Sequence, residues 1–289
     1  MIYRIIFSMR YVFVFLVLLF IFLGLVFSNS RFMNIISNEP KFLFIDSKSF
    51  YDIYYNNRNT IVVDLRDYGD YKKSHIDGAI HFDVDNLFET YLGIPRKIKR
   101  VDNLIYTLSD TGIGTYYDVG IYSDNLQDAM VLASILHLFK VNGIYIIKDG
   151  FEGWKNNKLP ISDKIKLVER GYFSPKISKS FYDSVIWDLK KTENQIGRFL
   201  AVAVSYSRIP LIPKSIYIKP KFSYDRYVTG SYYNSYDISK NKYILLYGND
   251  NYEVLQVYFV LKLFLEYPNV VIFNGGINEW ISNGLPVVQ

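Results

Sequence analysis

The feature that most constrains the fold is a strand and helix pattern that occurs twice. Over residues 119–147, a short β-branched run is followed by apolar residues at helical spacing and then by another apolar strand. The same order returns over residues 242–273. Strands that alternate with helices favour a mainly parallel sheet flanked by helices. We therefore predict an α/β chain with two similar domains.

Each copy of the pattern ends in a glycine-containing turn followed by a tryptophan. Gly150 and Trp154 in the first copy align with Gly276 and Trp280 in the second. This spacing indicates an internal duplication in which the framework of one domain has been kept.

The boundaries follow from where these patterns begin and end. We predict a first domain at 45–162 and a second at 206–289. The Lys- and Ser-containing stretch at 163–205 is the predicted linker and is the least interpretable part of the chain.

An uncharged apolar run at 11–28 follows Arg4 and Arg10. Eighteen residues at about 1.5 Å each give roughly 27 Å of helix, close to the hydrocarbon thickness of a bilayer. We predict that residues 1–30 are an uncleaved membrane anchor or a cleaved signal peptide, with a cut after Ser30. The preceding arginines favour a cytoplasmic N-terminus, which leaves both domains extracytoplasmic.

The chain contains no cysteine, which excludes disulfides, thiolate metal ligands and a cysteine nucleophile. His75, His81 and His137 are the only histidines and have no metal-ligand spacing. We therefore predict neither a metal nor a cofactor. The net charge of +5 is dispersed along the sequence, so no nucleic-acid partner is expected.

Several motifs together resemble those of tandem rhodanese-like sulfurtransferases, over roughly residues 45–289. Asp64 and Arg66, followed by His75 and Gly78, are similar to the family pattern D-x-R … G-H-I-P-G-A. The closing segment G-G-x-x-x-W … G-x-P-V is similar to residues in both copies. These are Gly150, Trp154, Gly275, Gly276, Trp280 and Pro286.

The second copy departs more from the family pattern at its start. Tyr217 and Lys219 are interpreted as standing where the aspartate and arginine of D-x-R would be, and 228–231 (VTGS) is only faintly similar to the motif that follows. We predict a structural role for the motif residues of both copies.

The resemblance implies a loop after the central strand that carries a persulfide-forming cysteine and an arginine. The equivalent cysteine positions hold Ser123 and Gly248, and the arginine positions hold Asp128 and Glu253. A hydroxyl cannot form a persulfide, and a carboxylate repels an anionic sulfur donor. The sequence therefore predicts a rhodanese-like protein without sulfurtransferase activity.

Two functions remain after catalysis by the chain itself is set aside. The first is a binding module at the membrane that holds an unidentified protein partner, which the 27 tyrosines would suit because tyrosine is favoured at interfaces. The alternative is a sulfurtransferase or sulfur-relay component that depends on the thiol of a partner.

Overall fold

The computed structural model describes residues 41–289, apart from 58, 115, 167–169, 172 and 174–178. Residues 41–289 form one compact unit. Within the described residues, no helix combines the length and the apolarity that a membrane crossing requires. The predicted membrane or signal segment at 11–28 lies outside them.

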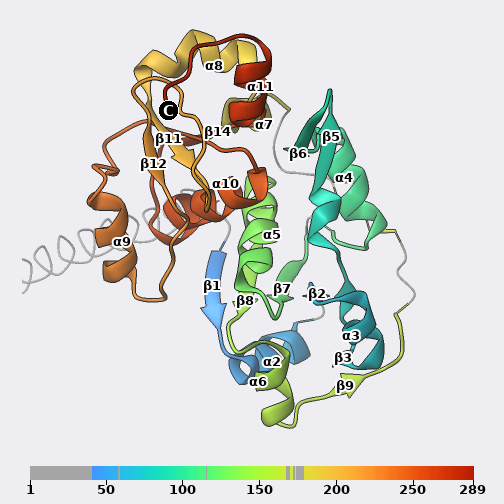
Figure 1. The fold of residues 1–289 in the computed structure, drawn as a ribbon. Coiled ribbons are helices and arrows are strands. Elements are labelled where there is room, and N and C mark those ends of the chain that lie inside the picture. The colour runs from blue at the N-terminus through green and yellow to red at the C-terminus, as the bar shows by residue number, and fades with distance from the viewer. Residues whose placement is uncertain (1–40, 58, 115, 167–169, 172, 174–178) are drawn as a thin grey trace, which may run out of the picture. The chain divides into compact units, whose positions relative to one another are not determined.

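The first half of the described chain, residues 41–162, contains a five-stranded parallel sheet in the order β1-β8-β7-β2-β4 (Figure 1). Its strands are β1 (Lys41–Ile45), β2 (Thr60–Asp64), β4 (Ile80–His81), β7 (Asp118–Tyr122) and β8 (Gly143–Ile147).

Helices and two small antiparallel sheets surround this first sheet. The helices are α2 (Ser47–Asn56), α3 (Tyr68–Lys73), η1 (Val84–Leu87), α4 (Val101–Asp110), α5 (Leu126–Leu138) and α6 (Gly150–Asn156). The small sheets are β3 (His75–Ile76) with β9 (Ile161–Ser162) and the hairpin of β5 (Phe88–Tyr91) and β6 (Ile94–Ile98).

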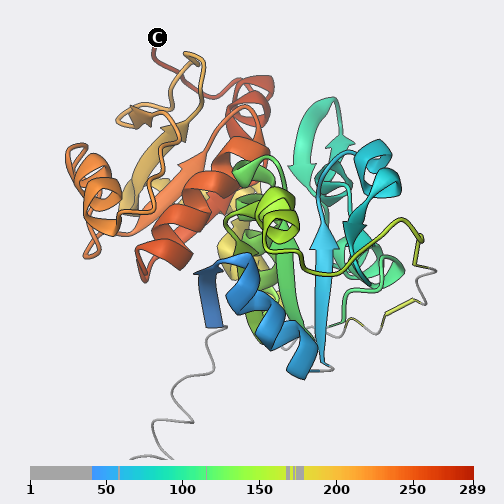
Figure 2. The same ribbon diagram turned by 90° about the horizontal axis from the view of Figure 1, so that it is seen from below.

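The second half repeats this arrangement with a parallel sheet in the order β10-β14-β13-β11-β12 (Figure 2). Its strands are β10 (Ile186–Trp187), β11 (Leu200–Val204), β12 (Ile216–Ile218), β13 (Ile244–Tyr247) and β14 (Val270–Phe273). Its helices are α7 (Lys179–Val185), α8 (Leu189–Gln195), η2 (Ile196–Arg198), α9 (Arg226–Asn234), α10 (Asn251–Tyr258), η3 (Phe259–Phe264) and α11 (Gly276–Ser282).

The second sheet starts earlier than the predicted boundary at residue 206. β10 and β11 belong to this sheet but lie inside 163–205, the predicted linker. The short apolar run that becomes β11 has the β-branched character of a buried central strand. The linker interpretation was therefore wrong for this part, because one short strand gives a weak periodic signal.

The two halves share one hydrophobic core, which forms around α5 and α10. Side chains alternate between the two faces of a strand, and Val63 and Ile121 are on the face of the first sheet that belongs to this core. Val202 and Leu246 contribute to the same core from the second sheet. Helix α5 is buried on nearly all sides and packs against α10. A helix with this all-round apolar pattern is expected between two layers and not at a surface.

The predicted duplication is visible in matching local geometry. The indole N–H of Trp154 donates to the Pro160 carbonyl at 2.8 Å, and that of Trp280 donates to the Pro286 carbonyl at 2.9 Å. Gly150 starts α6 with φ 57° and Gly276 starts α11 with the same φ, a left-handed conformation that favours glycine.

Candidate functional site

Ser123 lies in the loop between β7 and the N-terminus of α5. Its hydroxyl oxygen accepts a hydrogen bond from the Asn125 N–H at 3.1 Å. The Asn125 side chain caps α5 by accepting from the Gln127 N–H at 3.2 Å. The serine therefore contributes to the turn that leads into the helix.

Asp128, at the arginine position of this loop, has its Oδ2 atom 3.5 Å from the Ser123 hydroxyl. Its Oδ1 atom accepts a hydrogen bond of 2.6 Å from the hydroxyl of Tyr252, which belongs to the second half. Burial raises the pKa of the Asp128 carboxyl, while the hydrogen bonds from Tyr252, Asn125 and Ser123 oppose that rise. The first loop thus has a half-buried carboxylate beside the Ser123 hydroxyl.

Gly248 directly follows β13, the equivalent strand of the second half, and has no room for a side chain. A Cβ at this position would lie 2.5 Å from the Val204 carbonyl oxygen. The Gly248 carbonyl accepts from the Ile277 N–H at 2.8 Å, which fixes the loop against α11. A cysteine at 248 would therefore displace backbone atoms.

Glu253, at the second arginine position, accepts a hydrogen bond from the Tyr206 N–H at 3.1 Å. Burial raises the pKa of the Glu253 carboxyl, and hydrogen bonds from Ser205 and the Tyr206 N–H lower it in part. The carboxylate is thus used to hold the loop after β11.

The β5–β6 hairpin of the first half contacts the loop of the second. The Arg96 guanidinium pairs with Asp85, lies 3.4 Å from an Asp250 carboxylate oxygen and stands 5.2 Å from the centre of the Tyr252 ring. The Asn251 side chain donates to the Arg96 carbonyl at 2.9 Å. Both loops are consequently tied to the opposite half of the molecule.

A second pair of contacts strengthens the same junction. Lys97 and Glu279 form an ion pair of 3.1 Å with side chains only 13% and 16% exposed. The Asn274 carboxamide accepts from the Ile98 N–H at 2.7 Å and donates to the Ile98 carbonyl at 2.9 Å. A Cβ on Gly275 would collide with the Glu279 carboxylate.

Asp64 and Arg66 form a buried ion pair at the end of β2. The arginine Nη2 lies 2.7 Å from the Asp64 Oδ2 atom and also donates to the Ser74 carbonyl at 2.7 Å. The Tyr122 hydroxyl donates to the same carboxylate, and the Phe151 ring lies 3.9 Å from the guanidinium. The contacts of this pair thus hold the end of β2 against the Ser74 carbonyl and the Tyr122 hydroxyl.

His75 starts β3 just after α3, and Gly78 lies in the turn that follows β3. The His75 Nδ1 donates to the Tyr71 carbonyl at 2.7 Å, and the imidazole stacks on the Tyr71 ring. Gly78 has φ 78°, and a Cβ there would lie 2.5 Å from the Tyr54 hydroxyl. The hydrogen bonds of the Ser123 hydroxyl are to Asp128 and Asn125, and neither His75 nor Gly78 is among these partners.

The counterpart of this turn in the second half is 211–216 (LIPKSI), and not 228–231 as interpreted from the sequence. The Ile212 N–H donates to the Tyr247 hydroxyl at 2.9 Å, as the Ile76 N–H donates to the Tyr122 hydroxyl at 3.2 Å. Residues 228–231 instead lie in α9.

The same comparison corrects the positions assigned to the aspartate and arginine. The Tyr217 hydroxyl donates to the Ser205 carbonyl at 2.9 Å, as His81 Nε2 donates to the Arg66 carbonyl at 2.9 Å. Tyr217 therefore matches His81, and Ser205 matches Arg66. By strand register Ala203 stands at the Asp64 position, because it pairs with Tyr247 as Asp64 pairs with Tyr122.

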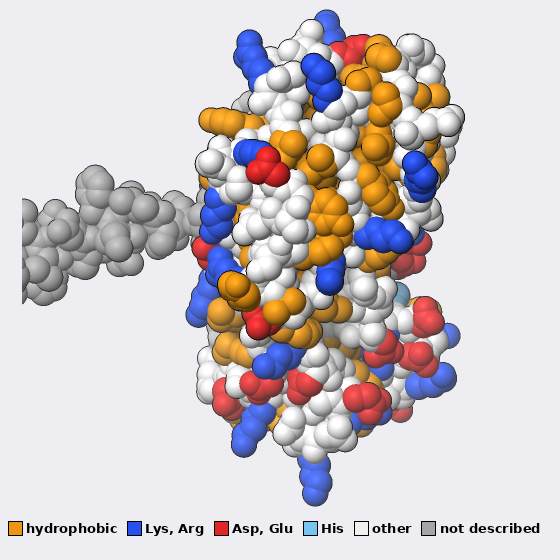
Figure 3. Space-filling view, turned by 60° about the vertical axis from the view of Figure 1, so that its left-hand side comes forward, with side chains coloured by type: hydrophobic (Ala, Val, Ile, Leu, Met, Phe, Trp, Pro, Cys, Tyr) orange, Lys and Arg blue, Asp and Glu red, His pale blue; other side chains and the backbone are white. Residues whose placement is uncertain are grey.

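Two further features could take part in binding, an exposed surface at α9 and a cavity beside these loops. On the face that Figure 3 shows, hydrophobic side chains form a broad band between scattered Lys and Arg side chains. In α9 and just before it, Tyr224 is 50% exposed, Tyr227 82% and Val228 47%. Three large apolar or aromatic side chains are thus exposed close together in sequence at the start of α9.

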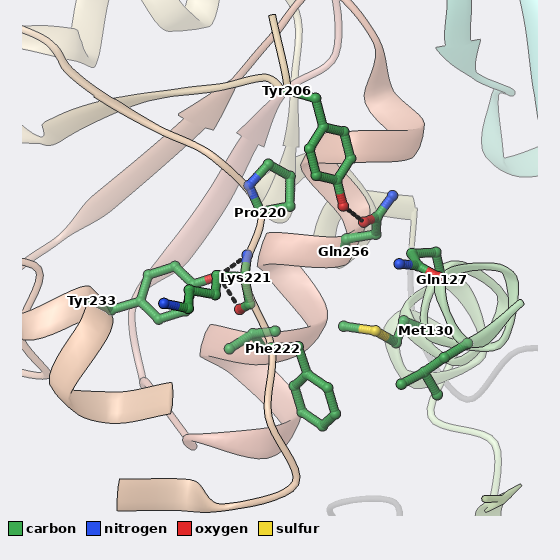
Figure 4. A pocket seen from close by; sticks show the side chains of 10 residues that line it. Gln127, Met130, Tyr206, Pro220, Lys221, Phe222, Tyr233 and Gln256 are labelled. Carbon is green, nitrogen blue, oxygen red and sulfur yellow. Dashed lines mark hydrogen bonds between the residues drawn. The ribbon is translucent and has the colours of Figure 1, made fainter. Parts of the chain in front are cut away.

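The second feature is a cavity of about 350 Å³ between the two halves (Figure 4). Leu126, Gln127 and Met130 line it from α5, and Tyr206 and Gln256 line it from the second half. Sequence reasoning missed this cavity, as it missed Tyr252 and Arg96, because each of these features depends on how the two halves pack. Across the described ranges, no cluster of three or more His, Asp or Glu side chains could hold a metal ion.

Comparisons with known proteins agree with this geometry. Residues 48–157 match the rhodanese-like domain family. A curated protein of Synechococcus elongatus, whose name describes it as a thiosulfate sulfurtransferase, is 22% identical over 263 residues, which cover 80% of this chain and 81% of that protein.

Solved structures show the same fold. SseA from Escherichia coli, a 3-mercaptopyruvate sulfotransferase, superposes with a TM-score of 0.65 at 14% identity over 81% of this chain and 98% of that one. A complex of EanB with hercynine gives 0.67 at 17% identity over 85% of this chain and 69% of that one. Residues 48–157 are thus a rhodanese-like domain in a chain that has the fold of the 3-mercaptopyruvate sulfotransferase SseA, is similar in sequence to a curated thiosulfate sulfurtransferase and contains no cysteine.

Proposed function

We propose that this protein is a rhodanese-like binding module that does not transfer sulfur. The observation that carries this proposal is that neither of the loops after β7 and β13 has a thiol at the predicted cysteine position. Ser123 offers a hydroxyl beside a carboxylate, and Gly248 offers no side chain and no space for one. A persulfide needs a thiolate, which neither loop can supply.

Electrostatics support the same conclusion. Thiosulfate and 3-mercaptopyruvate are anions, and the active loop of a sulfurtransferase must hold a negative charge. Here Asp128 faces the first loop, and Asp250 and Glu253 face the second. Arg96, which contacts Asp250 in the second loop, is also paired with Asp85.

The proposed place of action is the extracytoplasmic side of a membrane, with residues 11–28 as the anchor or as a cleaved signal. Its support is the charge-free apolar run that follows Arg4 and Arg10. The exposed aromatic side chains at α9 are a suitable contact surface for a protein partner.

The test is a thiosulfate-to-cyanide transfer assay on the full-length protein in mild detergent. We expect the rate to equal that of buffer. The Ser123→Cys variant is expected to show the same rate as buffer because Asp128 repels the anionic donor. Its matched control is Ser282→Cys, which places a thiol at an exposed site. A measurable rate in the unmodified protein would overturn the proposal.

The alternative is a sulfur-relay component that uses the thiol of a partner. Repeating the assay with glutathione as the acceptor supplies a thiol from outside the chain. We expect the protein not to accelerate this reaction, since both loops carry carboxylates. An acceleration that scales with protein concentration would favour the relay function instead.

A further inference from the structure

We propose that the cavity between α5 and the second half binds a neutral, planar ring compound with an amide-like edge. This inference rests on the proposed binding function and names a ligand class for it. The volume of about 350 Å³ is near the lower end for small-molecule pockets, which suits one or two fused rings.

The position of the cavity is the first argument. Gln127 and Met130 come from the first two turns of α5, directly after the Ser123 loop. Gln256 comes from α10, one turn after Glu253. A ligand here would contact both halves beside the former catalytic loops, and pockets of this kind are often found between domains.

The charge of the lining is the second argument. Neither aspartate nor glutamate lines the cavity, and Lys221 is its single charged lining residue. The Lys221 ammonium group lies 4.9 Å from the centre of the Tyr232 ring, and Tyr232 is not part of the lining. An ionic ligand would lose its hydration without gaining a charged partner, so the lining favours a neutral compound.

The polar groups of the lining are the third argument. Figure 4 shows the side chains of Gln127 and Gln256 near one another, with the Tyr206 hydroxyl donating to the Gln256 Oε1 atom at 2.8 Å. This bond fixes the orientation of the Gln256 carboxamide. A carboxamide carries both donors and acceptors, so it pairs best with a ligand edge that does the same.

The aromatic walls are the fourth argument. Phe222 and Tyr233 also line the cavity, and Figure 4 shows Tyr233 on the side away from Met130 with Phe222 between them. The Tyr233 hydroxyl donates to the Lys221 carbonyl at 2.9 Å, which holds its ring in place. Tyr233 is fully buried and supports this wall from behind, so the partly exposed Phe222 ring and the Met130 thioether sulfur are the groups that favour contact with a planar ring.

The experiment compares three ligands of nearly equal shape by ligand-observed NMR titration of the full-length protein in mild detergent. Nicotinamide is neutral, nicotinate is an anion, and N1-methylnicotinamide is a cation. We expect nicotinamide to bind at least about tenfold more tightly than either ion. Uracil and adenine extend the neutral series with other amide-like edges.

Variants locate the binding. Met130→Trp fills the cavity and should abolish the nicotinamide signal, while Gln127→Leu should weaken binding without disturbing the fold because Gln127 is exposed. Gln289→Leu, at an exposed glutamine outside the lining, is the matched control and should bind as the unmodified protein does.

The proposal is overturned if none of the three neutral ring compounds binds, if an ion binds as tightly as nicotinamide, or if Met130→Trp leaves binding unchanged. The transfer assay gives an independent outcome. Sulfurtransferase activity would overturn the proposed non-catalytic function. If the titrations fail and the protein shows no transfer activity, only this ligand assignment is overturned.

Discussion

The Tyr252 hydroxyl donates a 2.6 Å hydrogen bond to the Asp128 carboxylate, and this contact joins the two catalytic-type loops of the fold. Asp128 occupies the arginine position of the first half, and Tyr252 lies next to Glu253, the arginine position of the second. The Asn125 side chain also donates to the Tyr252 oxygen at 3.1 Å. The contact therefore connects one half to the other at the predicted arginine position of the first half and beside that of the second.

Tyr252→Phe should destabilise the protein by about 1–3 kcal/mol, because the half-buried Asp128 carboxylate loses a hydrogen-bond donor. Urea denaturation of the unmodified and variant proteins measures the difference. Tyr227→Phe, at a tyrosine that is 82% exposed, is the control and should change stability by less than about 0.5 kcal/mol. Equal effects of the two substitutions would show that the Tyr252 bond contributes nothing specific.

Because the pKa of Asp128 is raised in the folded protein, the stability of the protein depends on pH in a direction that can be stated. The native state holds this proton more tightly than the unfolded chain, so Asp128 lowers stability above its raised pKa. This penalty disappears as the pH falls towards about 4, the ordinary carboxyl value.

Asp128→Asn removes the titrating group but keeps an oxygen that can accept from Tyr252. The variant should therefore gain stability relative to the unmodified protein as the pH rises from 4 to 7, by less than about 1 kcal/mol because solvent screens a half-buried group. Urea midpoints measured across this range give the difference. A difference that is constant with pH, or that changes in the opposite direction, would contradict the assigned pKa shift.

Gly248→Ala should destabilise the protein by about 1–3 kcal/mol, since the new methyl group would press on the Val204 carbonyl oxygen. Thermal and urea denaturation provide the measurement. Gly197→Ala is a matched control because nothing lies within 4 Å of the position that a Cβ would take at that exposed glycine. If Gly248→Ala proved as stable as Gly197→Ala, the loop would have more freedom than the structure shows.

The framework of the fold could be predicted because it depends on local patterns. Strand and helix periodicity indicated two parallel sheets, and the alignment of Trp154 with Trp280 identified a pair of residues with the same hydrogen bond to a proline carbonyl. Glycines 150 and 276 were recognisable because a left-handed backbone restricts the residues that can stand there.

Features that depend on packing could not be predicted in the same way. Lys214 adopts φ 68° where the first half has Gly78, so the motif in the second half lost its most recognisable residue. Ala203 and Ser205 replaced the ion pair of Asp64 and Arg66, which removed the remaining signal. The contacts of Tyr252 and Arg96 join residues more than 100 positions apart, and no periodicity records them.

The electrostatic state of the first loop can be measured by introducing one thiol. Because the chain has no cysteine, Ser123→Cys creates a unique reactive group about 3.5 Å from the Asp128 carboxylate. A neighbouring negative charge disfavours the thiolate, which is the form that reacts with iodoacetamide. The double variant Ser123→Cys/Asp128→Asn should therefore be alkylated up to about tenfold faster at pH 7, a factor that corresponds to one unit of thiol pKa.

The matched pair for this measurement is Ser282→Cys with and without Asp128→Asn. Because Ser282 is exposed and outside the loop, its alkylation rate should not respond to the change at 128. Equal rates for the two Ser123→Cys proteins would mean that the carboxylate does not act on the loop. In that case, repulsion of the donor by Asp128 would no longer explain an inactive Ser123→Cys variant, and the hydrogen bonds of the turn would become the stronger explanation.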